Sequence, residues 1–316
     1  MKNFPVISLI LIFCISAFAL RQVSQHGYWI EAQWLPDGSI LLTGPKYRGI
    51  YLRYSDNRLD TVTDDWKAGY KPAYVPNLNA IAFSGTPDID KMSSLSLYSF
   101  DSGEISILSS DGDFGPPILT AGDGICAFDG GKLRRFDESG NETATFDCGA
   151  YVTVSVGSDF AWCDRSGVAY IYRIKSGKTE SLEYSGSATG RLFNPIPSPD
   201  GDFVLFEELG GPMVLVSASD LSVTELQVGD YPVFIEKPYG ILFLETTDDG
   251  EKITDSRVMF LPITDSEPGV AVGLIASSPP DAIVTRADYS PKFGLLLTTQ
   301  DGDVFVEKLN IVDKLK

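Results

Sequence analysis

The stretch Pro36-Asp37-Gly38-Ser39-Ile40-Leu41-Leu42-Thr43 joins a tight turn to a short apolar strand. Pro presets the backbone angle of a turn, Asp hydrogen-bonds its own backbone two residues on, and Gly accepts a positive φ. A run of Ile, Leu and Thr after turn residues is typical of a β-strand. The stretch therefore predicts a turn that leads directly into an apolar strand.

The same turn-and-strand module recurs seven times along the chain. Two other clear copies are Ser198-Pro199-Asp200-Gly201 before 203–206 and Ser290-Pro291 before 295–298. Four weaker copies carry their turns at 75–77, 122–124, 157–159 and 237–240. A unit that recurs about every 40 residues predicts a repeat architecture.

Each module contains four short strands. In the second module they fall at 72–75, 80–83, 95–100 and 105–108. Apolar residues nowhere repeat at helical spacing over three turns, and 30 Gly with 19 Pro leave little room for a long helix. Four strands in about 40 residues is the period of a propeller blade. We predict an all-β chain, a β-propeller of seven four-stranded blades, with six or eight blades as alternatives.

The seventh module lacks an obvious outer strand. It has strand patterns at 283–289, 295–298 and 304–308 and little after them. Because blades cover one another's faces only in a closed ring, the missing strand must come from a chain end. Either 20–24 or 311–315 could supply it, and we favour the N-terminal segment, which would clasp the ring shut.

The first nineteen residues have the form of a signal peptide. Lys2 gives a positive start, 6–15 is a short apolar run, and Ala17-Phe18-Ala19 has the small residues of a cleavage site. We therefore predict export to the periplasm or the medium, with 20–316 as a single mature domain. A retained membrane anchor and lipidation at Cys14 are the alternatives, although bulky Phe13 argues against lipidation.

The formal charge of −18, with 43 acidic and 25 basic residues, excludes several partners. It repels nucleic acid and anionic lipid, so neither nucleic-acid binding nor membrane insertion of the mature domain is expected. The acids are scattered through turns, which favours a role in solubility over a surface that meets cations or basic partners.

Three cysteines remain after the predicted cleavage, each in or beside an apolar strand pattern: Cys126, Cys148 and Cys163. Buried free thiols that pack as small hydrophobic groups are one interpretation. A single disulfide in an oxidising compartment is the other. No Cys-x-x-Cys motif supports a zinc or thioredoxin-like site.

Residues 34–43, 197–207 and 289–299 resemble the Pro-Asp-Gly repeat of TolB-like propellers, found in the TolB C-terminal domain and in many exported bacterial proteins. Ser198 to Gly201 matches the Ser-Pro-Asp-Gly form fully, whereas Ser290-Pro291 keeps only its start. The resemblance implies a β-propeller that serves as a binding platform. It transfers no catalytic residue, because the motif is a turn.

Catalytic motifs are missing from the sequence. His26 is the only histidine, and neither Gly-x-Ser-x-Gly nor a Gly-rich phosphate loop occurs. A carbohydrate-active hydrolase or lyase with carboxylates around the central channel is the remaining enzymatic alternative. Several acids sit near the ends of second strands, but no catalytic pair is assigned among them: Glu207, Glu208, Glu245 and Asp164.

No cofactor or metal ligand is assigned, and calcium is the one ion the turns leave open. Three acidic turns offer hard oxygen ligands, at 111–113, 248–250 and 301–303. None reaches a full twelve-residue calcium loop, so hairpin turns are the favoured explanation and calcium is the lesser alternative.

Aromatic residues make up 11% of the chain, and most are expected to pack between blades. Trp66 and Tyr70 lie in a connection between two modules, where aromatic residues are favoured in binding surfaces. We predict these two as binding residues. The leading function is an exported, monomeric, non-enzymatic propeller that binds a protein or peptide partner.

Overall fold

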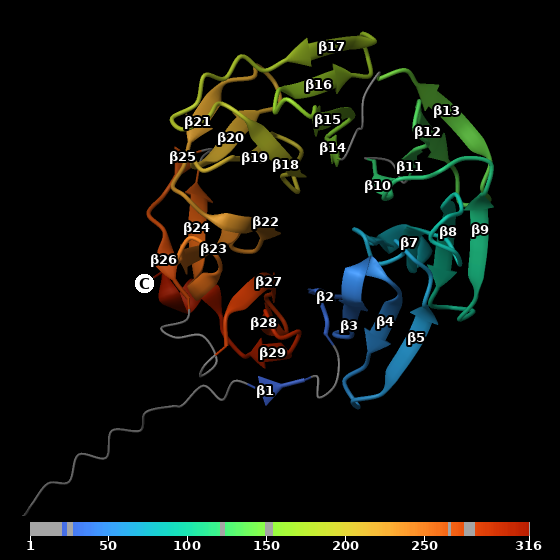
Figure 1. Ribbon diagram of the computed structural model, residues 1–316, viewed down its shortest axis with the longest axis horizontal. Helices are drawn as coiled ribbons and strands as arrows, with labels where there is room; N and C mark the ends of the chain where they lie inside the picture. The colour runs from blue at the N-terminus through green and yellow to red at the C-terminus, as the bar shows by residue number, and fades with distance from the viewer. Residues whose placement is uncertain are drawn as a thin grey trace, which may run out of the picture.

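The computed structural model describes residues 21–23, 28–120, 124–148, 154–264, 267–274 and 282–315. The predicted signal peptide, Cys14 and His26 lie outside these described residues. Seven antiparallel sheets stand side by side in a ring, with first strands toward the centre and fourth strands at the rim (Figure 1). The predicted all-β, seven-bladed β-propeller is confirmed.

The first four blades are regular sheets of four strands in chain order. Blade 1 contains β2 (Glu31–Trp34), β3 (Ile40–Thr43), β4 (Ile50–Arg53) and β5 (Leu59–Thr63). Blade 2 contains β6 (Ala73–Val75), β7 (Ala80–Gly85), β8 (Ser94–Ser99) and β9 (Ile105–Ser109). Blade 3 contains β10 (Ile118–Leu119), β11 (Ile125–Phe128), β12 (Leu133–Phe136) and β13 (Glu142–Phe146). Blade 4 contains β14 (Val154–Val156), β15 (Asp159–Cys163), β16 (Ala169–Arg173) and β17 (Lys178–Ser181).

The last three blades include one extended blade and one completed by the N-terminal segment. Blade 5 contains β18 (Leu192–Pro197), β19 (Phe203–Glu208), β20 (Met213–Ser217) and β21 (Val223–Glu225). Blade 6 contains β22 (Asp230–Glu236), β23 (Tyr239–Asp248) and β24 (Ile253–Thr264), with β25 (Glu267–Pro268) and β26 (Val272–Gly273) both paired to β24. Blade 7 contains β27 (Val284–Ser290), β28 (Gly294–Thr299), β29 (Val304–Glu307) and β1 (Arg21–Gln22).

The second strand of every blade is the apolar run that the sequence modules predict. These strands are buried on both faces because each blade packs between two others; Leu41 faces blade 2, whereas Leu42 faces blade 7. Among the described residues, seven hydrophobic clusters form, one at each of the seven blade interfaces. Stability is therefore distributed around the ring, as expected for a repeat protein.

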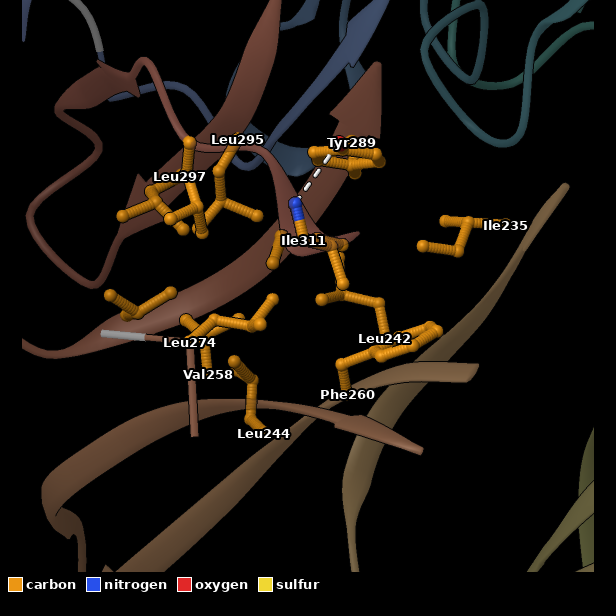
Figure 2. Close-up of a cluster of buried hydrophobic side chains, with 13 residues drawn as sticks. Ile235, Leu242, Leu244, Val258, Phe260, Leu274, Tyr289, Leu295, Leu297 and Ile311 are labelled. Atoms are coloured by element: carbon orange, nitrogen blue, oxygen red, sulfur yellow. Dashed lines mark hydrogen bonds between the residues drawn. The ribbon is translucent and has the colours of Figure 1, made fainter. Parts of the chain in front are cut away.

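Figure 2 shows the cluster between blades 6 and 7, where Leu242 and Phe260 face Leu295 and Leu297. The C-terminal 3-10 turn η3 (Ile311–Lys314) inserts Ile311 into this cluster, and its backbone N–H donates to the Tyr289 hydroxyl at 3.3 Å. The segment 311–315 thus caps a blade interface and is not the outer strand of blade 7.

The Pro-Asp-Gly turns adopt the geometry that their residues predict. Asp37 Oδ1 accepts from the Ser39 backbone N–H at 2.9 Å, and Gly38 has φ +89°. A Cβ at Gly38 would lie 2.6 Å from the Phe293 ring of blade 7. Glycine is therefore required by the backbone angle, and any other residue would also have to displace the Phe293 ring.

All such turns lie at one end of the ring, between the first and second strands of each blade; we name this the turn end. The connections between blades, and the loops between second and third strands, lie at the opposite end, the crossover end, because successive strands are antiparallel. The described helices are 3-10 turns of three or four residues, η1 (Pro45–Tyr47), η2 (Pro76–Leu78) and η3. None of them has the length or the apolar character needed to cross a membrane.

The N-terminal segment closes the ring, as predicted. β1 pairs with β29 through Arg21 opposite Val306 and Gln22 opposite Phe305, and Val23 N–H donates to Val304 O at 2.8 Å. Val23 is buried in the cluster between blades 7 and 1.

A carboxyl group at the same seam joins blade 7 to blade 1. Asp288 Oδ2 accepts from the Trp34 backbone N–H at 2.7 Å, and the Trp34 indole N–H donates to Gly294 O at 3.0 Å. Burial raises the pKa of the Asp288 carboxyl to about 6, although the hydrogen bonds oppose the rise.

Removal of the clasp tests ring closure. A chain that starts at residue 24 should melt about 5–10 °C below one that starts at residue 21, because it loses the β1 ladder and the buried Val23. Differential scanning calorimetry measures the difference. Equal melting temperatures for the two chains would show that the clasp does not hold the ring.

Asp288→Asn tests the seam carboxyl. The folded-state pKa of about 6 exceeds the ordinary 3.8, so the native state holds a proton that the unfolded state has lost between these values. The contribution of protonated Asp288 to the free energy of unfolding is therefore complete below pH 3.8 and should be lost as the pH rises to about 6. The free energy of unfolding of the wild type, relative to that of the variant, should fall across this window in urea titrations. Parallel pH profiles for the two proteins would refute the assignment.

Candidate functional site

In three blades, a residue with a strained backbone lies just before or within the first strand and is followed by a proline. Lys71, Asn194 and Tyr231 have φ of 51°, 47° and 51°, and each is followed directly by Pro. Proline normally keeps the preceding residue extended, and a left-handed backbone costs a non-glycine residue about 1–3 kcal/mol. Strain of this kind clusters at functional sites, so its recurrence in three blades marks the crossover end of the ring centre.

β-Bulges accompany two of these steps. The register between β18 and β19 shifts between Phe193 and Ile196, around Asn194. The register between β22 and β23 shifts between Asp230 and Val233, around Tyr231. A bulge re-aims a side chain away from the regular pleat, and here it frees Asn194 and Tyr231 for contacts outside their own sheets.

The side chains from these steps join a polar group that we name the central network: Lys71, Asn194, Glu207, Tyr231 and Arg286. Lys71 Nζ donates to Asn194 Oδ1 at 3.4 Å, which links the entry to blade 2 with blade 5. Asn194 Nδ2 donates to Glu207 Oε2 at 2.6 Å, and the Tyr231 backbone N–H donates to Oε1 at 3.3 Å. The Arg286 guanidinium of blade 7 lies 3.7 Å from the centre of the Tyr231 ring. Four blades are thereby connected through the centre of the ring.

The network balances buried charges of both signs. Burial lowers the pKa of the Lys71 ammonium, and the charges of Glu31 and Glu207 oppose this shift. Burial raises the pKa of the Glu207 carboxyl, and the bonds from Asn194 and Tyr231 oppose it. Each group is therefore held by a partner that compensates part of its desolvation.

A pocket of about 520 Å³ opens beside Lys71 at the crossover end. We name it the crossover pocket. The connection into blade 2, the β3–β4 loop and the connection into blade 3 supply most of its walls. Its lining residues are Lys46, Tyr47, Lys67, Tyr70, Lys71, Ser84, Asp113, Phe114, Gly115, Pro116, Phe128 and Gly130.

Two of these walls are fixed to each other by backbone hydrogen bonds. Gly69 N–H donates to Tyr47 O at 3.1 Å, and Gly49 N–H donates to Asp65 O at 2.9 Å. Lys46, Tyr47 and Lys67 also have positive φ, between 57° and 65°. The pocket wall is thus a tied and strained structure, which suits a preformed binding surface.

The structure places Tyr70 in the crossover pocket and Trp66 beside it. Tyr70 is 41% exposed and meets Tyr47 edge to face, with ring centres 5.0 Å apart. Trp66 is half-buried, its backbone pairs with Thr86, and the Arg48 guanidinium lies 5.0 Å above its ring. Trp66 does not line the pocket. The binding role of both residues stays a prediction.

Of the acids noted at the ends of second strands, only Glu207 joins the central network. Glu208 points to the other face of β19 and accepts from the backbone N–H groups of 188–190, so it anchors the connection into blade 5. Glu245 is exposed and lies 3.8 Å from Arg257. Asp164 caps its own turn through Ser166 and Val168.

The cysteines lie in and beside the interface between blades 3 and 4. All three are free thiols, and burial raises the pKa of each to about 12. Cys126 and Cys148 are members of one hydrophobic cluster, with Cys163 partly buried against the next. Thiols with such high pKa values are poor nucleophiles near neutral pH.

Two of the three acidic turns considered for calcium have carboxylates that are engaged in other contacts. Asp111 pairs with Arg134 at 2.8 Å, and Asp113 accepts from the Ser93 backbone N–H at 2.9 Å. Asp249 accepts from backbone N–H groups of its own turn. The described part of the chain contains no group of three or more His, Cys, Asp or Glu arranged to hold a metal ion.

Sequence reasoning missed the central network, although a signal for it was present. The pairs Lys71-Pro72, Asn194-Pro195 and Tyr231-Pro232 each lie just before or within a first strand. A polar or aromatic residue before Pro at the same point of three modules departs from the apolar pattern. That departure marks the three positions where side chains turn toward the ring centre.

No protein-family model matches the sequence, and no curated protein matches it. Solved structures match its fold. A streptogramin B lyase has a TM-score of 0.64 at 14% identity, covering 92% of this chain and 98% of its own. Virginiamycin B lyase from Staphylococcus aureus has a TM-score of 0.61 at 11% identity, covering 91% and 98%. A chain of the mitotic checkpoint complex has a TM-score of 0.63 at 10% identity, covering 98% and 100%. At these identities the likeness shows the β-propeller fold alone.

Proposed function

We propose that this protein is an exported, non-enzymatic β-propeller that binds a protein or peptide partner through the crossover pocket. The pocket carries the proposal, because it combines exposed aromatic rings with a backbone held in a strained, tied conformation. Aromatic residues are enriched at the energetic centres of protein interfaces. In this proposal Tyr70 and Tyr47 form the contact surface, and Trp66 with Arg48 extends it beside the pocket.

The proposed location rests on sequence. Residues 1–19 have the charge, apolar run and small-residue end of a signal peptide. The resemblance of the Pro-Asp-Gly turns to TolB-like repeats agrees with a place in a bacterial cell envelope. In this proposal the mature domain works as a monomer, without a metal or cofactor.

The neighbouring structures support a binding role as well as an enzymatic one. One propeller is a chain of a protein complex, the mitotic checkpoint complex. Another is a catalytically inactive histidine-to-alanine variant of virginiamycin B lyase with quinupristin. The single histidine of this chain, His26, precedes blade 1 in a segment outside the described residues. The channel residues described here therefore offer no counterpart to that histidine.

A carbohydrate-active hydrolase or lyase is the second candidate, and Glu207 is the observation that favours it. Its carboxyl group is buried and has a raised pKa, as a general acid requires. Both of its oxygens are already hydrogen-bonded within the central network, however. Turnover of a glycan panel that is abolished by Glu207→Gln would establish this candidate in place of the binding role.

Affinity capture tests the proposed function. The mature domain should retain a partner from envelope extracts, and a Tyr47→Ala/Tyr70→Ala double variant should retain at least tenfold less, since both rings leave the pocket wall. Ile107→Ala serves as the control, because Ile107 is 64% exposed on the outer strand β9. Quantitative mass spectrometry gives the amounts. Equal retention by wild type and double variant, or no retained partner together with glycan turnover, would refute the proposal.

A further inference from the structure

The crossover pocket is locally basic in a strongly acidic chain. The chain has a formal net charge of −18. Three lysines line the pocket, Lys46, Lys67 and Lys71, and Asp113 is the single acid in its lining. Such a reversal of local charge favours a ligand that carries negative charge.

Two of the three ammonium groups, those of Lys67 and Lys71, differ in how far they are already engaged. Lys67 Nζ lies 3.5 Å from Asp113 Oδ1, so its charge is countered within the pocket. Lys71 Nζ donates to Asn194 Oδ1 at 3.4 Å, the one hydrogen bond described for it, and Glu31 and Glu207 act on it only through their charges. An ammonium group can donate three hydrogen bonds, so Lys71 keeps donor capacity where it borders the pocket.

The walls around these cations are apolar. The edge-to-face pair of Tyr47 and Tyr70 forms one side, and Phe114 and Pro116 form another. Rings in this arrangement suit a large apolar or aromatic side chain. The ligand should therefore unite a negative charge and an apolar group within a volume of about 520 Å³.

We propose that the crossover pocket binds the carboxy-terminal residue of a partner protein. Its carboxylate is held by Lys71 and Lys46, and its large apolar side chain packs against Tyr47, Tyr70 and Phe114. A chain terminus fits because carboxylate and side chain then leave the same Cα, whereas an internal acid and its apolar neighbour belong to different residues. Capture of a terminal carboxylate is an established mode of peptide recognition. This inference rests on the proposed function and adds the chemistry of the ligand.

Three probes test the inference by isothermal titration calorimetry on the mature domain. They are acetyl-Gly-Gly-Phe with a free carboxylate, the same peptide as its C-terminal amide, and 3-phenylpropionate. We expect the free acid to bind at least tenfold more tightly than the amide, and more tightly than 3-phenylpropionate, which lacks the peptide backbone. Raising the salt concentration should weaken only the two acids.

Two lysine variants locate the anion. Lys71→Met should reduce the preference for acid over amide to less than about twofold, because the partly engaged ammonium is lost. Lys178→Met is the matched control and should keep the preference, since Lys178 is exposed on the outer strand β17 of blade 4 and does not line the pocket. Melting temperatures verify that both variants fold, and the acid-to-amide comparison on the wild type does not depend on them.

The outcomes separate this inference from the proposed function. Equal affinity of acid and amide would overturn the carboxylate assignment, while Tyr70-dependent partner retention could still hold. Binding of 3-phenylpropionate as tight as that of the peptide would point to a free small acid and overturn the assignment to a partner terminus. No binding of the free acid at about 10 mM would overturn the inference as well. Equal partner retention by the wild type and the Tyr47→Ala/Tyr70→Ala double variant would instead refute the proposed function.

Discussion

The pairing of β1 with β29 is the interaction on which the rest of this structure depends. Each blade covers its apolar faces with two neighbours, so an open ring would expose the faces of blades 1 and 7 together. The clasp and the Asp288–Trp34 bond hold that seam. A closed ring also fixes the distance across its centre, which lets Lys71 from the entry to blade 2 reach Asn194 of blade 5.

The two ends of the ring are built on different principles. At the turn end, Asp and Gly satisfy local backbone geometry, and Gly38 is required because its φ is +89°. At the crossover end, Lys71, Asn194 and Tyr231 hold left-handed conformations directly before a proline, where glycine would avoid the cost. The first pattern serves folding. The pattern at the crossover end is expected where polar side chains must converge on a site.

The sequence alone predicts the ring but does not predict the site, for physical reasons that particular residues illustrate. Second strands such as β3 and β28 can be predicted from the sequence, because burial on both faces requires an unbroken apolar run. The outer strand β1 has two residues and no apolar pattern, so only the incomplete seventh module pointed to it. Tyr70 could be placed in an inter-blade connection, but its contact with Tyr47 depends on how two loops meet. The bond from Lys71 to Asn194 joins positions 123 residues apart, which no local pattern encodes.

We assign recognition to the crossover end and architecture to the turn end. Hydrogen–deuterium exchange of the mature domain with saturating acetyl-Gly-Gly-Phe tests this division most directly. Amide exchange should slow at 44–49 and 64–72, which form the pocket walls, and stay unchanged in the turns at 36–39 and 198–203. Slower exchange in those turns, with none in the pocket walls, would contradict the account.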